Sequence, residues 1–109
     1  MNNLINFTKT LLSDYLTSCT FELVGNDHYE KKDYDSGKIL ETGVSYLLDI
    51  LDESNYRTRI LVKIKGHKKL YSKSEIVDGI HVNLLGAYVS FLDKDGVYLK
   101  ATGIDEIIK

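Results

Sequence analysis

The residues of this 109-residue chain that are best suited to chemistry are cations rather than catalytic groups. Positions 57–73 contain no acid and seven basic residues, namely Arg57, Arg59, Lys63, Lys65, Lys68, Lys69 and Lys73. The rest of the chain contains the other seven basic residues and all 16 acids. A basic segment within an acidic chain can attract an anion locally although the net charge is −2.

Tyrosines accompany this basic segment. The chain has eight tyrosines and no tryptophan. Single-stranded nucleic acid is bound by cations that contact phosphates and by flat rings on which bases stack. We therefore predict a nucleic-acid-binding surface made of Tyr46, Tyr56, Arg57, Arg59, Lys63, Lys65, His67, Lys68, Lys69, Tyr71 and Tyr88. The alternative interpretation is that the cations form a solvated strand face and that some of these tyrosines pack in the core.

Motifs for catalysis and metal binding are absent from the sequence. It contains no nucleophile elbow, no phosphate-binding glycine-rich loop and no dinucleotide fingerprint. His28, His67 and His81 are far apart, and the segment 93–96 lacks the later ligands of a calcium loop. We therefore expect a binding protein that is not an enzyme, with no metal and no other cofactor.

The basic segment itself has the pattern of a half-exposed strand. Thr58, Ile60, Val62 and Ile64 alternate with Arg57, Arg59, Leu61, Lys63 and Lys65, so the apolar and basic residues fall on opposite faces. This register predicts that Val62→Asp unfolds the domain. It also predicts that reversing the charges of Arg59 and Lys63 abolishes oligonucleotide binding and leaves the thermal midpoint nearly unchanged.

Other periodic segments predict the elements around this strand. Apolar residues over positions 4–16 follow one helical face, and Cys19, Phe21 and Leu23 alternate in a strand that we expect to end at residues 25–27. A hairpin turn is expected at residues 35–38, with Gly37 at positive φ. Residues 43–51 predict a strand that buries Val44, Tyr46, Leu48 and Ile50.

The C-terminal half is predicted to be equally rich in strands. Ser72 and Glu75 have the spacing of a helix-capping box, and Gly86 is expected to bend a long strand. A hairpin turn at residues 93–96 leads to a last strand and a short apolar closing segment. The count of about five strands predicts a mostly β (α+β) fold, a small five-stranded OB-like barrel with an N-terminal helix. A generic α+β roll is the alternative.

Length and composition bound the organisation and the compartment. The 109 residues fit a single domain, with a helix within residues 1–18 and a barrel-like body over residues 19–109. Cys19 is the only cysteine, which we expect to be a buried structural thiol. No secretory signal and no apolar run long enough for a membrane span is found, so we expect a cytoplasmic protein that does not contact membranes.

Three segments carry a family resemblance: GNDHYEKKDYDSGKILETGVSYLLDIL, ILVKIKG and VNLLGAYVSFLDKDGVYLKATGIDEIIK. Together they resemble small auxiliary single-strand DNA-binding and helicase-processivity proteins of Gram-positive conjugative elements and phages. The resemblance implies a salt-sensitive binder of single-stranded DNA without sequence preference, which acts in the replication or transfer of a mobile element. RNA in place of DNA, and a protein partner such as a helicase, are open alternatives. It implies that Tyr46 stacks a base and that Arg57, Arg59, Lys63 and Lys65 contact phosphates.

A second function class is a protein-interaction or inhibitor module that acts on a host or defence protein. Carboxylates would then be presented where the target expects phosphate, with candidates Asp27, Glu30, Asp33, Asp35, Glu41, Asp49, Asp52 and Glu53. Salt dependence separates the two classes, because phosphate contacts weaken steeply as salt is added. The sequence is compatible with a monomer or an oligomer.

Overall fold

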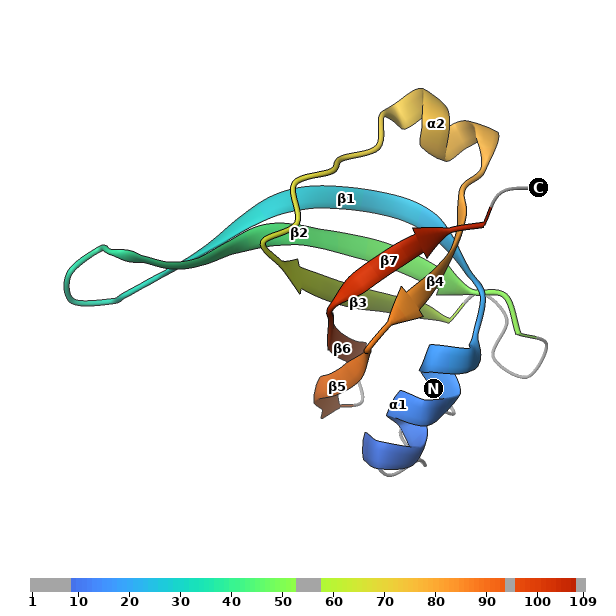
Figure 1. Ribbon diagram of the computed structural model, residues 1–109, viewed down its shortest axis with the longest axis horizontal. Helices are drawn as coiled ribbons and strands as arrows, with labels where there is room; N and C mark the ends of the chain where they lie inside the picture. The colour runs from blue at the N-terminus through green and yellow to red at the C-terminus, as the bar shows by residue number, and fades with distance from the viewer. Residues whose placement is uncertain (1–8, 53–57, 94–95, 108–109) are drawn as a thin grey trace.

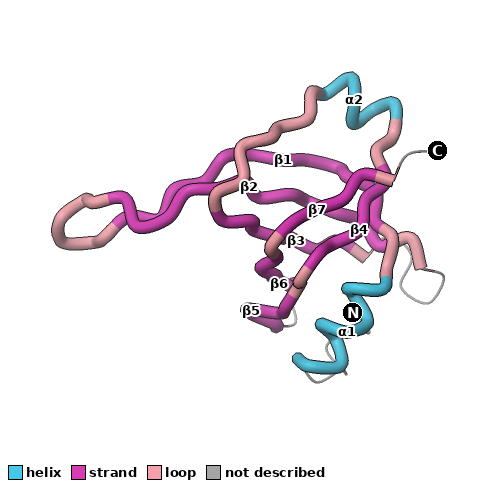
Figure 2. The backbone as a smooth tube through the Cα atoms, viewed as in Figure 1, coloured by secondary structure: helices cyan, strands magenta, loops and turns pink. Residues whose placement is uncertain are grey.

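Seven strands dominate the computed structural model, which describes residues 9–52, 58–93 and 96–107. In chain order the elements are α1 (Lys9–Ser18), β1 (Phe21–Lys32), β2 (Ile39–Ile50), β3 (Arg59–Lys65), α2 (Lys73–Asp78), β4 (His81–Leu85), β5 (Tyr88–Asp93), β6 (Gly96–Ala101) and β7 (Gly103–Glu106). The strands form one curled sheet, a half-barrel, with α1 near the chain start (Figures 1 and 2). The prediction of a mostly β fold with an N-terminal helix is confirmed.

The strand order in the sheet is β5-β6-β3-β2-β1-β4-β7. Strands β3 and β6 are parallel, and every other pair is antiparallel. Only Gly86 and Ala87 separate β4 from β5, and only Thr102 separates β6 from β7. These two strand pairs therefore form one long bent hairpin whose halves pair with β1 on one side and β3 on the other.

The predicted count of five strands was wrong, because the long strand predicted around Gly86 is divided into β4 and β5, and the closing segment after the last predicted strand forms β7. Gly86 has a φ of 59°, a left-handed value that favours glycine, so the bend expected at this residue is confirmed. Across the bend, the Thr102 N–H donates to the Leu85 carbonyl oxygen over 2.9 Å. The bend lets a single hairpin follow the curvature of the sheet.

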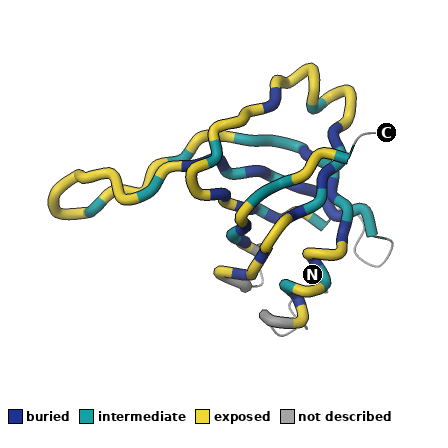
Figure 3. Tube along the Cα trace, viewed as in Figure 1, coloured by how far each residue is buried: buried dark blue, intermediate teal, exposed yellow. Residues whose placement is uncertain are grey.

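Strand β1 is longer than predicted and continues to Lys32. A register shift between Leu23 and Gly25 marks a β-bulge, after which the side chains alternate in the opposite phase. The continuous period-two pattern that predicts a strand therefore stops at the bulge. The β1–β2 hairpin turns near Gly37, whose φ of 70° confirms the predicted turn. Residues 30–40 form an exposed arm that projects from the body (Figures 1 and 3).

The core lies on the inner face of the sheet. The predicted inward residues Val44, Tyr46, Leu48, Ile50, Ile60, Val62 and Ile64 are all buried there. Leu12 and Leu16 of α1 complete the core, and the Ser13 hydroxyl accepts a hydrogen bond from the Val89 N–H of β5. The predicted helix residues 4–8 lie outside the described residues.

Two local predictions on the other elements are also confirmed. The thiol of Cys19 is buried, and this burial raises its pKa. Ser72 caps α2: its hydroxyl accepts from the Glu75 N–H over 3.2 Å, and the Glu75 carboxylate accepts from the Ser72 N–H over 3.0 Å. Gly79, with a φ of 100°, ends this helix.

Candidate nucleic-acid interface

The outer face of the sheet has a row of directly opposed residues that crosses five strands. Asp27 of β1 lies opposite Ser45 of β2, and Ser45 lies opposite Lys63 of β3. Lys63 in turn lies opposite Lys100 of β6, which lies opposite Tyr88 of β5. Directly opposed residues share a face of the sheet and stand close enough to interact. The backbone pairing therefore places two cations and a tyrosine side by side.

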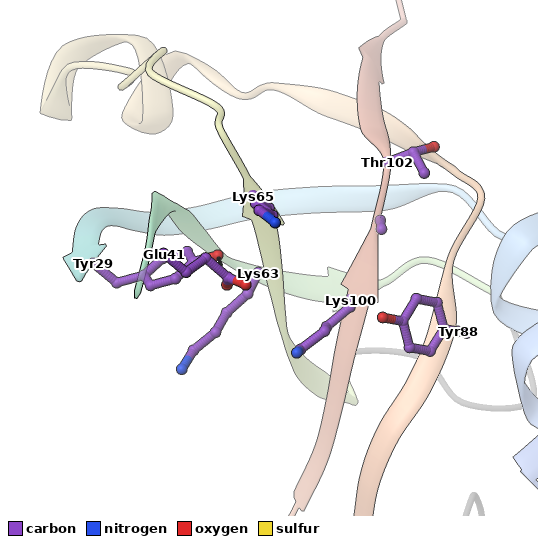
Figure 4. Close-up of a pocket in the computed structure, with 8 residues that line it drawn as sticks. Tyr29, Glu41, Lys63, Lys65, Tyr88, Lys100 and Thr102 are labelled. Carbon is purple, nitrogen blue, oxygen red and sulfur yellow. Dashed lines mark hydrogen bonds between the residues drawn. The ribbon is translucent and has the colours of Figure 1, made fainter. Parts of the chain in front are cut away.

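A cavity of about 470 Å³ opens on this face, and we call it the lysine pocket. Its lining comes from five strands and the β6–β7 bend: Tyr29, Glu41, Lys63, Lys65, Tyr88, Lys100, Ala101 and Thr102. Figure 4 shows Lys63 and Lys100 extending from neighbouring strands, with the Tyr88 hydroxyl directed towards the Lys100 strand. Three lysines against one glutamate leave a net charge of +2 at neutral pH, and the ring of Tyr88 is 53% exposed.

Tyr29 is held flat on the sheet at one end of the lysine pocket. It lies opposite Gly43, and a Cβ at Gly43 would stand 2.8 Å from the Tyr29 ring. The Tyr29 hydroxyl donates to a Glu41 carboxylate oxygen over 2.6 Å, and the Lys63 ammonium lies 5.1 Å from the ring centroid. Partial burial, followed by the Glu41 hydrogen bond, raises the Tyr29 pKa to about 12. The Tyr29 hydroxyl therefore remains protonated and keeps its hydrogen bond to Glu41 at neutral pH.

Glu41 is the only carboxylate among the residues that line this pocket. The hydrogen bond from Tyr29, helped by the positive charges of Lys100, Lys65 and Lys31, lowers its pKa. Glu41 therefore stays ionised and holds Tyr29 while it partly offsets the lysines. An anion that enters the pocket is attracted by three ammonium groups and repelled by one carboxylate.

The prediction that Tyr46 stacks a base was wrong for this structure, because its side chain is 0% exposed on the inner face. Its hydroxyl donates to the Lys69 carbonyl oxygen over 2.6 Å and lies 2.9 Å from Nδ1 of His67. Since the single hydroxyl proton points to Lys69, the His67 Nδ1–H donates to the Tyr46 oxygen. Tyr71 is also buried, with the Lys69 ammonium 4.8 Å from its ring centroid.

The fold thus divides the predicted basic surface into two parts. Lys63 and Lys65 line the lysine pocket on the outer face. His67 and Lys69 belong to the loop after β3, and both are hydrogen-bonded to the Tyr46 hydroxyl on the inner face. Lys68 is exposed in the same loop. Tyr56 and Arg57 lie outside the described residues.

Arg59 has a structural role that the sequence did not indicate. Its guanidinium forms a two-point contact with Asp49, at 2.8 Å from Nε to Oδ1 and 3.3 Å from Nη2 to Oδ2. The Asp49 side chain is only 4% exposed, whereas that of Arg59 is 57% exposed. Arg59 is therefore engaged in neutralising a buried carboxylate. The expectation that its charge reversal leaves stability unchanged needs correction, because a glutamate would face Asp49.

Replacing Arg59 by alanine is expected to destabilise the fold by about 1.5–3 kcal/mol, the range for hydrogen bonds to a charged group. The physical reason is that the buried Asp49 carboxylate loses the guanidinium that compensates its charge. Urea unfolding followed by circular dichroism measures the change. Lys65→Ala removes an exposed cation of the same strand that is remote from Asp49; it is the control and should leave the midpoint in place. Equal midpoints for both variants would contradict a structural role for Arg59.

Five residues that line the pocket were not predicted for the nucleic-acid-binding surface, namely Tyr29, Glu41, Lys100, Ala101 and Thr102. Lys100 is adjacent to the buried Leu99 and so lies on the outer face, but it is outside the acid-free segment 57–73 that suggested the other cations. Tyr29 and Glu41 stand on strand regions that the bulge and the long hairpin concealed. The signal for Tyr29 was the hairpin turn itself, since counting seven residues in each direction from Ser36 reaches Tyr29 and Gly43.

Comparisons with protein-family models, curated proteins and solved structures find no match for this chain. Within the described residues, no helix is long and apolar enough to cross a membrane. The same residues contain no group of three or more histidine, cysteine or acidic side chains that could hold a metal ion. The functional assignment therefore rests on the geometry of the outer face.

Proposed function

We propose that this chain is a non-catalytic binder of single-stranded nucleic acid, with single-stranded DNA as the preferred ligand and the lysine pocket as the phosphate-binding site. The observation that carries the proposal is the convergence of Lys63, Lys65 and Lys100 with the exposed ring of Tyr88 in one cavity. Three ammonium groups suit phosphates, and a half-exposed tyrosine offers a face to a base.

The strand connections support the same proposal. The sheet contains a β1-β2-β3 meander, a β1–β4 pair and a parallel β3–β6 pair. The helix α2 connects β3 to β4. If β4–β5 and β6–β7 are each counted as one bent strand, this is the order of an oligonucleotide/oligosaccharide-binding barrel. Such barrels bind single strands with the exposed face of their central strands, which is the face that has Lys63 and Lys65 here.

The test is a double substitution within the lysine pocket. Lys63→Ala with Lys100→Ala is expected to weaken binding of a labelled single strand of about 30 nucleotides by roughly tenfold or more, because two charged contacts are lost. The slope of log affinity against log salt should become shallower by about 1.4, at 0.7 per phosphate contact of a single strand. Fluorescence anisotropy across a salt series measures both quantities.

The matched control removes the same charge from the other part of the basic segment. Lys68→Ala with Lys69→Ala takes two cations from the loop that lies outside the pocket. A third variant, Glu41→Gln, keeps an acceptor for Tyr29 and removes the one negative charge, so binding should become tighter. A larger loss from the loop variant than from the pocket variant would place the site elsewhere, and absence of binding at low salt would refute the function.

A second candidate function is recognition of a protein, for example a helicase or a host target, by the β1–β2 arm. The observation in its favour is that Tyr34 is fully exposed on the arm, with Ile39 at 49% and Leu40 at 55%. Exposed apolar groups on a projecting element are typical of protein contacts. The two candidates differ in the anisotropy experiment, since a protein-binding module has no salt-sensitive affinity for a bare oligonucleotide.

A further inference from the structure

A second, smaller hollow lies on the same outer face beside the lysine pocket. Its volume is about 200 Å³, several times the roughly 30 Å³ that a water molecule occupies in the liquid. Its lining comes from the three meander strands: Gly25, Asn26, Asp27, Ser45, Leu47 and Leu61. Gly25 lies opposite Leu47, and Leu47 lies opposite Leu61, so two neighbouring leucines stand beside a position without a side chain. The hollow therefore has apolar walls.

Asp27 is the polar group in the hollow that remains available to a ligand. Both ends of the Asn26 amide are engaged with the Tyr71 backbone, at 3.2 Å and 2.6 Å. The Ser45 hydroxyl donates to the Asp27 carbonyl oxygen over 3.3 Å. Among the described residues, the exposed Asp27 carboxylate makes no hydrogen bond or ion pair. It can therefore accept hydrogen bonds from an incoming group.

The hollow and the lysine pocket are linked by the cross-strand row. Asp27, Ser45 and Lys63 stand directly opposite one another on β1, β2 and β3. Two strand spacings separate Asp27 from Lys63, which is about 10 Å. A strand whose phosphates contact Lys63 and Lys100 can thus lay a base over the leucines. The row is positive at Lys100 and Lys63, which suits phosphates, and negative at Asp27, which suits a hydrogen-bond donor on the edge of a base.

We propose that this hollow is a nucleobase subsite that selects bases with an exocyclic amino group, cytosine above all, through the Asp27 carboxylate. This inference rests on the proposed function. A carboxylate accepts from the N4 amino group of cytosine. Uracil presents a carbonyl oxygen at that position, and its N3–H lies between two carbonyl oxygens that repel a carboxylate. The amino-bearing base therefore gains a charge-assisted hydrogen bond, and the oxo base meets like charge.

The experiment compares labelled oligo-dC and oligo-dU strands of about 30 nucleotides by anisotropy, at slightly alkaline pH where cytosine is neutral. Wild-type protein is expected to bind oligo-dC about fivefold or more tightly, the lower end of the discrimination for a specific base contact. Asp27→Asn should abolish or reverse this ratio, since an amide also donates to the uracil oxygen. Asp35→Asn, the same charge change on the exposed arm, should leave the ratio as it is.

A second variant tests the hollow itself. At Gly25 an added Cβ would meet only Leu47 side-chain atoms, at 3.7 and 3.9 Å, so Gly25→Val should fold. Its side chain should fill the space beside Leu47, weaken oligo-dC binding and remove the preference, with the salt slope unchanged. Equal wild-type affinities for both strands, or a preference that survives Asp27→Asn, would overturn the subsite and leave the proposed function intact. Failure of every strand to bind would overturn both.

Discussion

Val62→Asp is expected to abolish the cooperative unfolding transition of this protein. Val62 is 0% exposed on the inner face of β3, and its neighbours across the sheet are Tyr46 of β2 and Leu99 of β6, both buried. A carboxylate at this position must either lose its water or protonate, at a cost of several kcal/mol. Because a domain of this size is stable by only about 5–15 kcal/mol, a change of about 5 kcal/mol removes most of the folded population.

The matched control for Val62 is its neighbour on the chain. Leu61→Asp introduces the same side chain on the outer face, where Leu61 is only partly buried. Thermal and urea unfolding by circular dichroism should give a folded Leu61→Asp protein and an unfolded Val62→Asp protein. The reverse result would mean that the register of β3 is displaced by one residue, which moves every side chain of a strand to the other face.

Gly43→Ala is expected to be the most damaging substitution that adds only one methyl group. A Cβ at Gly43 would collide with the Ile64 carbonyl oxygen and stand 2.8 and 2.9 Å from Cε1 and Oη of Tyr29. The oxygen belongs to the backbone of the interior strand β3 and cannot move without disturbing the β2–β3 ladder. We expect a loss of about 3 kcal/mol or more, since overpacking here displaces backbone. The thermal midpoint should fall by roughly 10 °C or more.

Gly25→Ala is the matched control on the neighbouring strand β1. Its added Cβ would make ordinary contacts with Leu47, so the midpoint should move by less than a few degrees. Scanning fluorimetry of the two variants beside wild type gives the comparison. A small effect at Gly43 would show that Tyr29 is not held against this glycine. The same substitution also reports on the lysine pocket, because a displaced Tyr29 would release Glu41 and alter oligonucleotide affinity.

Much of the fold follows from local pattern. Alternation in residues 58–65 and 43–51 predicted which side chains face the core, because a strand that buries one face must place its apolar residues at every second position. The capping box at Ser72 and the positive φ of Gly37 and Gly86 are likewise local, since a hydroxyl acceptor or a missing Cβ has its effect within a few residues.

Local pattern failed where long-range pairing or a bulge decided the outcome. The register shift after Leu23 reverses the side-chain alternation of β1. The predicted strand therefore ended at residues 25–27, although β1 continues to Lys32. The breaks between β4 and β5 and between β6 and β7 depend on how the hairpin made of these four strands bends to pair with both β1 and β3. Neither the bulge nor the bends produce a repeating pattern in the sequence of one strand.

By itself the sequence determined that one strand has cations on one face and core residues on the other, because both alternations lie within the seven residues that form β3. Only the tertiary structure decided which cations act together. Lys100 is 37 positions after Lys63 and becomes its neighbour through the parallel β3–β6 pair, whereas Lys68 and Lys69 follow Lys65 closely and are carried away by the loop. It also decided that Tyr46 is core and Tyr88 surface, since burial depends on what packs against each ring and not on the residue type.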